Sequence, residues 1–203
     1  MTGSVSALSY PDLLLKWLSK MFAERHEVLL WIGVLWGIQL INSLMQNRLC
    51  VLGVMPRRPR GLVGIVFSPF IHGSWSHLMM NTVPLYMLMS MLIAEYGVMK
   101  TRVLSAYLIG CSGGMLWLFG NYGLHVGASG LIMAYIGFLL FRAFFNPSAQ
   151  LITVAVLVFY YCGGSLLSIF PQKDKHISYL GHLAGLLSGA LIAYLVHIKY
   201  LAL

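Results

Sequence analysis

Charged residues are scarce in this sequence. They make up 9% of the 203 residues, while 59% are hydrophobic and the mean hydropathy is +0.82. Water-soluble domains carry roughly 25% charged residues, so this composition excludes a water-soluble fold. A bilayer core of about 30 Å is crossed by roughly 20 apolar residues, and the length therefore suits one membrane domain of six helices.

Cysteine and aspartate are also scarce, and both absences narrow the chemistry. Cys50, Cys111 and Cys162 are odd in number and have neither paired nor metal-like spacing, so they indicate no disulfide framework. The only aspartates, Asp12 and Asp174, lie outside the apolar spans, so a pair of aspartates on facing membrane helices is excluded. No His-Glu-x-x-His segment is present to hold zinc.

Long apolar runs dominate what remains. They predict an all-α, polytopic membrane protein with six transmembrane helices, at residues 28–44, 77–96, 102–121, 129–145, 149–170 and 178–198. The apolar residues between Leu13 and Phe22 recur at helical spacing and predict an interfacial amphipathic helix. We therefore divide the chain into an N-terminal segment, residues 1–27, and a six-helix membrane domain, residues 28–203.

The net charge of +8 arises from basic residues spread over helix ends and loops. Such residues can meet lipid phosphates, so the expected partner of this charge is the membrane surface rather than nucleic acid.

Three places within the spans carry side chains suited to catalysis. His77 and Asn81 share one face at the start of the second span, while Ser129 and His182 lie at the starts of the fourth and sixth. Because successive spans alternate in direction, these three helix starts open on the same side of the bilayer. Polar groups at membrane depth are costly and are functional candidates by default, so we expect them to share one cavity.

Each signal also has a structural explanation. Gly-x-Ser-Gly occurs by chance among small residues, and the spacing of Gly181, Gly185 and Gly189 is typical of close helix packing. Here packing and function agree, because a glycine face would bring His182 towards Ser129. With aspartate pairs and zinc motifs excluded, peptide hydrolysis would need an activated nucleophile, and no carboxylate is placed to orient His182. The sequence thus permits a Ser129/His182 dyad.

At this point residues 28–198 resemble the rhomboid family of intramembrane serine proteases. The matching motifs are His72-Gly-Ser-Trp-Ser-His77-Leu-Met-Met-Asn81, Gly127-Ala-Ser129-Gly130, and Gly181-His182 followed by Gly185 and Gly189. Their order and spacing both fit the family.

The resemblance implies a six-helix bundle with a water-filled cavity. It implies that Ser129 attacks the scissile carbonyl, that His182 accepts its proton, and that Asn81, His77 and the Ser129 N–H stabilise the oxyanion. The supporting residues would be His72, Gly127, Gly130, Gly181 and Gly185. The substrate would be a transmembrane segment of another protein, with no cofactor or metal ion, and the expected location is a bacterial inner membrane.

Two positions depart from the family's pattern. Some members place an aromatic residue four positions after the serine, where this chain has Met133, with Tyr135 two positions further on. The Trp-Arg pair found in the first loop of some members is absent, and residues 56–60 read Pro-Arg-Arg-Pro-Arg. We therefore expect the contacts that orient His182 and anchor this loop to differ from those of such members.

Two other functions remain as alternatives. A rhomboid-like protein could bind transmembrane clients without cutting them, although it would not need both Ser129 and His182. A membrane electron carrier could ligate haem through His77, His125 or His182 on facing helices. An optical spectrum without a Soret band would exclude the second alternative.

Overall fold

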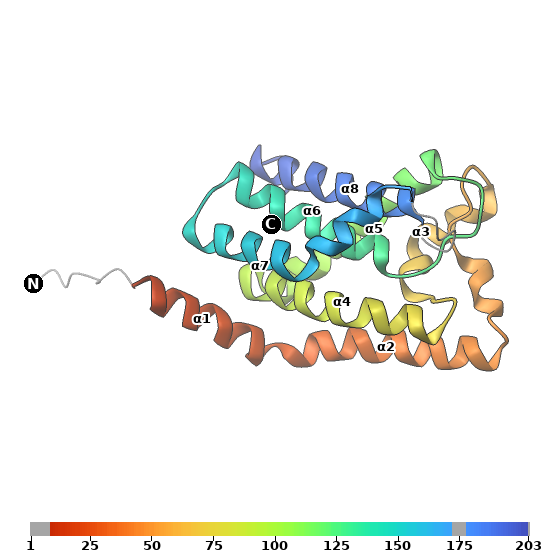
Figure 1. The fold of residues 1–203 in the computed structure, drawn as a ribbon, viewed down its shortest axis with the longest axis horizontal. Coiled ribbons are helices and arrows are strands. Elements are labelled where there is room, and N and C mark those ends of the chain that lie inside the picture. Colours follow the sequence, from red (N-terminus) through yellow and green to blue (C-terminus); the bar gives the residue numbers. More distant parts are fainter. Residues whose placement is uncertain (1–8, 172–177, 203) are drawn as a thin grey trace, which may run out of the picture.

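The computed structural model describes residues 9–171 and 178–202, and helices dominate it (Figure 1). The α-helices are α1 (Tyr10–Ala23), α2 (Arg25–Leu44), α3 (Gly64–Phe67), α4 (Trp75–Tyr96), α5 (Val98–Phe119), α6 (Ser129–Phe145), α7 (Ala149–Leu166) and α8 (Tyr179–His197). Short 3-10 helices are η1 (Arg48–Leu52), η2 (Pro59–Leu62), η3 (Ser68–Phe70) and η4 (Leu167–Ile169). The predicted all-α class is confirmed for the described residues.

Five helices are long and apolar enough to cross a membrane. They are α2, α4, α5, α7 continued through η4, and α8. The sixth predicted span, α6, has only 17 residues, which is shorter than the roughly 20 that a bilayer needs. The count of six spans therefore stays a prediction, as does the division of the chain between residues 27 and 28.

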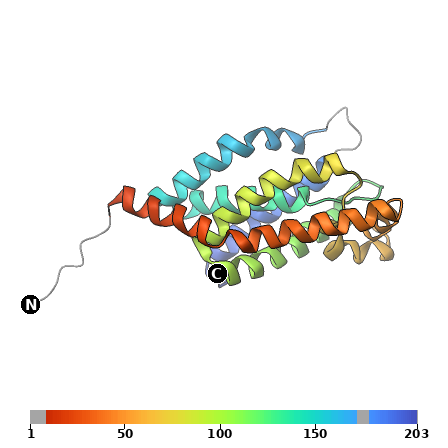
Figure 2. The same ribbon diagram turned by 90° about the horizontal axis from the view of Figure 1, so that it is seen from below.

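The short helix α6 runs through the middle of the bundle (Figures 1 and 2). Every side chain from Leu131 to Leu139 is buried, because α4, α5, α7 and α8 surround it. Its closest neighbour is α8, where a Cβ added at Gly185 or Gly189 would overlap the backbone of α6. Small residues thus let the two backbones meet, as the glycine spacing predicted.

The connection between α2 and α4 folds back over one end of the bundle. Val54 pairs with His125 in an isolated antiparallel bridge, which ties this connection to the segment before α6. Arg57 donates from Nη1 to the carbonyl oxygens of Leu118 and Gly120, at 3.2 and 2.8 Å, and lies 4.6 Å from the centre of the Tyr122 ring. These contacts anchor the loop although the family's Trp-Arg pair is absent.

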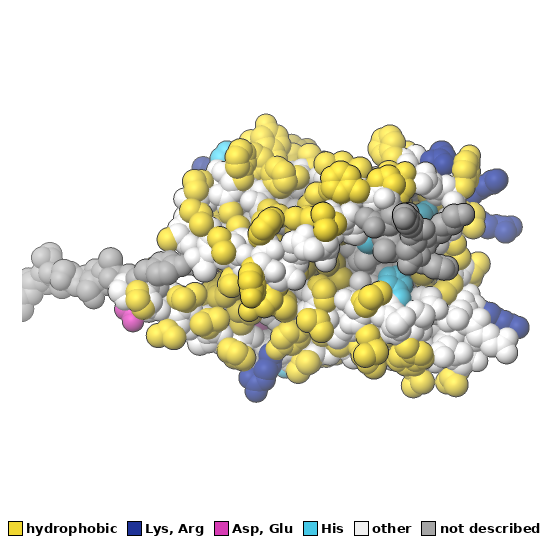
Figure 3. All heavy atoms as spheres, in the orientation of Figure 1, with side chains coloured by type: hydrophobic (Ala, Val, Ile, Leu, Met, Phe, Trp, Pro, Cys, Tyr) yellow, Lys and Arg dark blue, Asp and Glu magenta, His cyan; other side chains and the backbone are white. Residues whose placement is uncertain are grey.

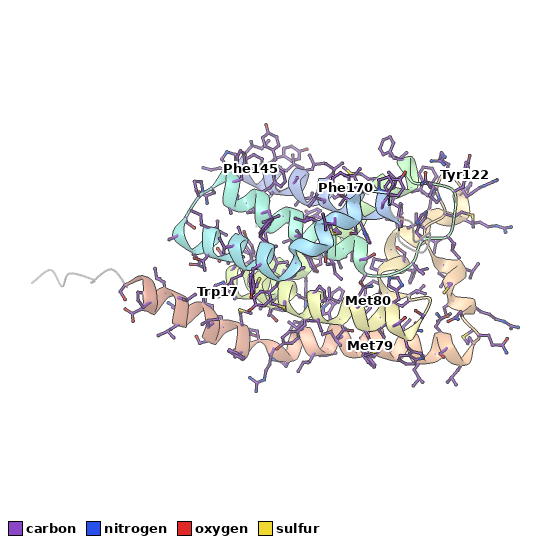
Figure 4. The ribbon with its side chains drawn as sticks, viewed as in Figure 1. Trp17, Met79, Met80, Tyr122, Phe145 and Phe170 are labelled. Atoms are coloured by element: carbon purple, nitrogen blue, oxygen red, sulfur yellow. The ribbon has the colours of Figure 1, made fainter. Side chains whose placement is uncertain are left out.

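The N-terminal helix α1 packs on the bundle through Trp17. This side chain is buried and lies between α1 and the neighbouring helices (Figure 4). Other apolar residues of α1, including Leu15 and Phe22, are exposed, as expected for a helix that meets lipid. Where α2 begins, Arg102 of α5 donates to both carboxylate oxygens of Glu27, at 2.8 and 2.7 Å, which fixes α2 against α5.

Candidate active site

Ser129 and His182 line one pocket at the end of the bundle that carries the folded-back loop. Its wall comes from η3, from α5 around Ser112, from residues 125–131, and from the first turn of α8. Gly127, Gly130 and Gly181 also belong to this wall. The space-filling view shows histidine side chains at this end of a largely hydrophobic face (Figure 3). The structure thus brings together the two residues of the predicted dyad.

The backbone before Ser129 has the conformation that only glycine accepts readily. Gly127 has a φ of +116°, and a Cβ there would clash with the ring of His77. Its N–H donates to the carbonyl oxygen of Ser68, at 2.9 Å. Helix α6 then begins at Ser129, whose N–H falls in the first turn, where backbone donors lack partners within the helix. A donor and the positive end of the helix dipole therefore face the pocket.

The ring of His182 is held from one side. Its Nδ1 lies 2.6 Å from the Oγ of Ser168 in η4. No hydrogen bond joins Ser129 to His182 within the described part of the chain. Such contacts often tighten only when substrate binds, so this geometry is compatible with a dyad at rest.

Asn81 and His72 form a buried polar cluster beside Ser129. The Nε2 of His72 lies 3.0 Å from the side-chain nitrogen of Asn81 and accepts from the N–H of Ala128, at 3.3 Å. Accepting requires Nε2 to be unprotonated, so the Asn81 amide donates as well. One N–H of that amide then remains for another acceptor.

Burial, with a smaller contribution from neighbouring His77, lowers the pKa of His72 to about 3. His72 is therefore neutral near pH 7 and can accept both hydrogen bonds. The ring of His77 lies edge-on to that of His72, with 5.1 Å between ring centres, and touches Gly127. Asn81 and His77 are thus connected to the Ser129 segment through His72 and Gly127.

Met133 occupies the position, four residues after Ser129, at which some family members have an aromatic residue. Met133 is buried against Gly185, and the Tyr135 hydroxyl lies 2.6 Å from Ser105 Oγ on α5. Among the described residues, no aromatic ring stacks on His182. The ring contacts Ser168 instead, a residue that the sequence analysis did not single out.

Comparisons with known proteins agree with this architecture. The family model of the Rhomboid domain matches residues 59–199, which is more than half of the chain. The chain belongs to the rhomboid family. With its apolar helices, this membership makes it a multi-pass integral membrane protein of rhomboid type.

Relatives of this rhomboid protein occur in mycobacteria and in a plant. An uncharacterized protein of Mycobacterium tuberculosis is 35% identical over 178 residues, which cover 83% of this chain and 73% of that protein. An uncharacterized protein of Mycobacterium leprae is also 35% identical, and the match covers 83% of this chain and 70% of that protein. RHOMBOID-like protein 4 of Arabidopsis thaliana is 28% identical over 135 residues, or 64% of this chain and 33% of the plant protein.

Proposed function

We propose that this rhomboid protein is an intramembrane serine endopeptidase with Ser129 as nucleophile and His182 as general base. The observation that carries the proposal is the shared pocket of these two side chains, which come from residues 53 positions apart. A client-binding rhomboid protein without catalysis would have no need of a serine and a histidine in one pocket.

The proposed reaction uses groups in and next to that pocket, because Asn81 and His77, expected to share one cavity with Ser129 and His182, are not among the residues that line it. The Nε2 of His182 takes the proton of the Ser129 hydroxyl as Oγ attacks the scissile carbonyl carbon, and the imidazolium then protonates the leaving amine. The oxyanion accepts from the N–H of Ser129 and from Asn81 and His77, which lie beside it through the Gly127 and His72 contacts. Water then hydrolyses the acyl-enzyme by the same proton transfers in reverse order.

The proposed substrate is a transmembrane segment of another protein. Such a segment is helical in the bilayer, and its backbone must unwind before a carbonyl can reach Ser129, so helix-weakening residues near the cut would favour cleavage. The mycobacterial relatives support a bacterial inner membrane as the location.

Labelling with a fluorophosphonate probe tests this function. Wild-type protein reconstituted in lipid should be labelled and should cleave a generic transmembrane substrate, whereas Ser129→Ala and His182→Ala should do neither. Ser112→Ala is the matched control, because Ser112 lines the same pocket but its hydroxyl donates to the carbonyl oxygen of Leu108, at 2.6 Å. Labelling of His182→Ala at the wild-type rate would exclude the dyad.

A further inference from the structure

Ser168 contacts the proposed base from a segment that carries none of the family's motifs. It lies in η4, between α7 and α8, and is 14 residues before His182 in the sequence. The helix η4 packs against both α7 and α8. The 2.6 Å distance between Ser168 Oγ and His182 Nδ1 is therefore a tertiary contact rather than a consequence of one helix's geometry.

The direction of this hydrogen bond follows from the other partner of Ser168. The hydroxyl of Ser168 has one proton, and it donates that proton to the backbone carbonyl of Ser165. Towards His182 the oxygen can then only accept. The proton of the neutral imidazole must therefore be on Nδ1, which leaves the lone pair of Nε2 free.

We propose that Ser168 is a positioning residue that fixes the tautomer and the ring orientation of His182, so that Nε2 is the nitrogen available to Ser129. This inference rests on the proposed function, in which Nε2 takes the serine proton. In serine proteases with a triad, a carboxylate has this role towards the histidine. Here a neutral hydroxyl, whose own proton is held by a backbone carbonyl, would take its place.

Because the Ser168 hydroxyl is a neutral acceptor, we expect its removal to lower kcat only moderately. The Nδ1–H of the imidazolium is a stronger donor than that of the neutral ring, so the contact strengthens as the base becomes charged in the transition state. Removing one neutral hydrogen bond should lower kcat about threefold to tenfold while leaving KM nearly unchanged. A structural defect at the end of α7 would instead lower the stability and the amount of active protein.

The test compares four variants of the full chain in detergent micelles. Ser168→Ala removes the hydroxyl that accepts from His182. Ser168→Cys keeps a similar side-chain volume but offers only a weak acceptor, so both variants should lose the fixed tautomer of His182. Ser168→Thr keeps the hydroxyl and should retain the wild-type tautomer and kcat. Ser165→Ala is the matched control, because it removes a neighbouring hydroxyl but keeps the backbone carbonyl that orients Ser168.

Two readouts separate this inference from the proposed function. In protein labelled with ¹⁵N-histidine, the ring signals that disappear in His182→Gln belong to His182 and report which nitrogen carries the proton. We expect protonated Nδ1 in wild type, Ser168→Thr and Ser165→Ala, and a shift towards protonated Nε2 in Ser168→Ala and Ser168→Cys. The kcat for a transmembrane substrate should be near that of wild type in Ser168→Thr and Ser165→Ala, and it should be lowered in Ser168→Ala and Ser168→Cys.

An unchanged tautomer in Ser168→Ala and Ser168→Cys overturns the inference, and so does an unchanged kcat in active preparations. If wild type binds but does not cleave any substrate, the proposed function fails instead, and the NMR signals of His182 still decide whether Ser168 sets its tautomer.

Discussion

The contact between α6 and α8 offers the sharpest test of how packing sets the geometry of the proposed catalytic pair. A Cβ added at Gly185 would overlap the backbone oxygen of Gly130 and would lie 2.9 Å from Met133 Cβ. Gly130 directly follows Ser129, and Gly185 lies one helical turn from His182. The substitution Gly185→Ala must therefore push apart the two helices that carry the proposed dyad.

The expected size of the effect follows from that overlap. Restoring ordinary van der Waals distances requires the backbones to separate by roughly 1 Å. A displacement of that size in a catalytic group costs about a hundredfold in rate, and overpacking costs roughly 1–3 kcal/mol of stability. We expect kcat to fall about a hundredfold, with a lowered Tm in detergent, and the assay is cleavage of a transmembrane substrate in proteoliposomes.

Gly110→Ala is the control for this substitution. Gly110 lies in the transmembrane helix α5, and a Cβ there would meet no atom within 4 Å. Replacing a helical glycine by alanine in open space should raise stability slightly, by about 0.5–1 kcal/mol, with no loss of activity. Wild-type kcat in Gly185→Ala would refute the argument that this glycine sets the distance between Ser129 and His182.

Two further predictions concern the proposed oxyanion donor Asn81 and the loop anchor Arg57. Asn81→Ala should lower kcat by roughly 10²–10³ with little change in KM, as measured by steady-state cleavage, because an oxyanion donor acts on the transition state; a change in KM alone would make Asn81 a binding residue. Arg57→Ala should lose the hydrogen bonds to Leu118 and Gly120 and lower the free energy of unfolding by roughly 1–3 kcal/mol, as measured by thermal unfolding, whereas Arg60→Ala, at an exposed position of the same loop, should change it little.

Hydropathy predicted the helices well and their ends less well. The predicted fourth span, residues 129–145, matches α6 at both ends, because a glycine-rich segment and Asn146-Pro147 flank it. The third was expected from residue 102, but α5 begins at Val98, directly after Gly97 with its φ of +80°. Lys100 hid this first turn, since a charged residue in a hydropathy pattern is typical of a loop.

The sequence motifs predicted the residues of the pocket but not the residues that form hydrogen bonds with them. Ser129 and His182 could be paired from the sequence because both begin helices that open on the same side of the bilayer. The contact of Ser168 with His182 and that of Ser68 with Gly127 join short 3-10 helices to distant segments. No periodicity marks such residues, because a single serine in an irregular segment has many possible partners.

The length of α6 explains why the folded-back loop and the proposed catalytic residue Ser129 depend on each other. Seventeen residues span only about 25 Å at 1.5 Å per residue, which is less than a bilayer core of about 30 Å. If the aromatic end around Phe144 lies at one interface, Ser129 must lie below the other. The non-helical backbone before it, residues 120–128, is then tolerated at that depth only if protein or water satisfies its polar groups.

The folded-back loop provides those partners. Ser68 accepts from the N–H of Gly127, Val54 exchanges backbone hydrogen bonds with His125, and His72 accepts from the N–H of Ala128. If Ser129 lies below the membrane surface, this loop must follow it inward, and the hydrogen bond from Arg57 to the carbonyl oxygen of Gly120 fixes the loop at its other end. Substitutions far from the pocket that release this loop should therefore affect the conformation of the Ser129 segment before they affect the helices.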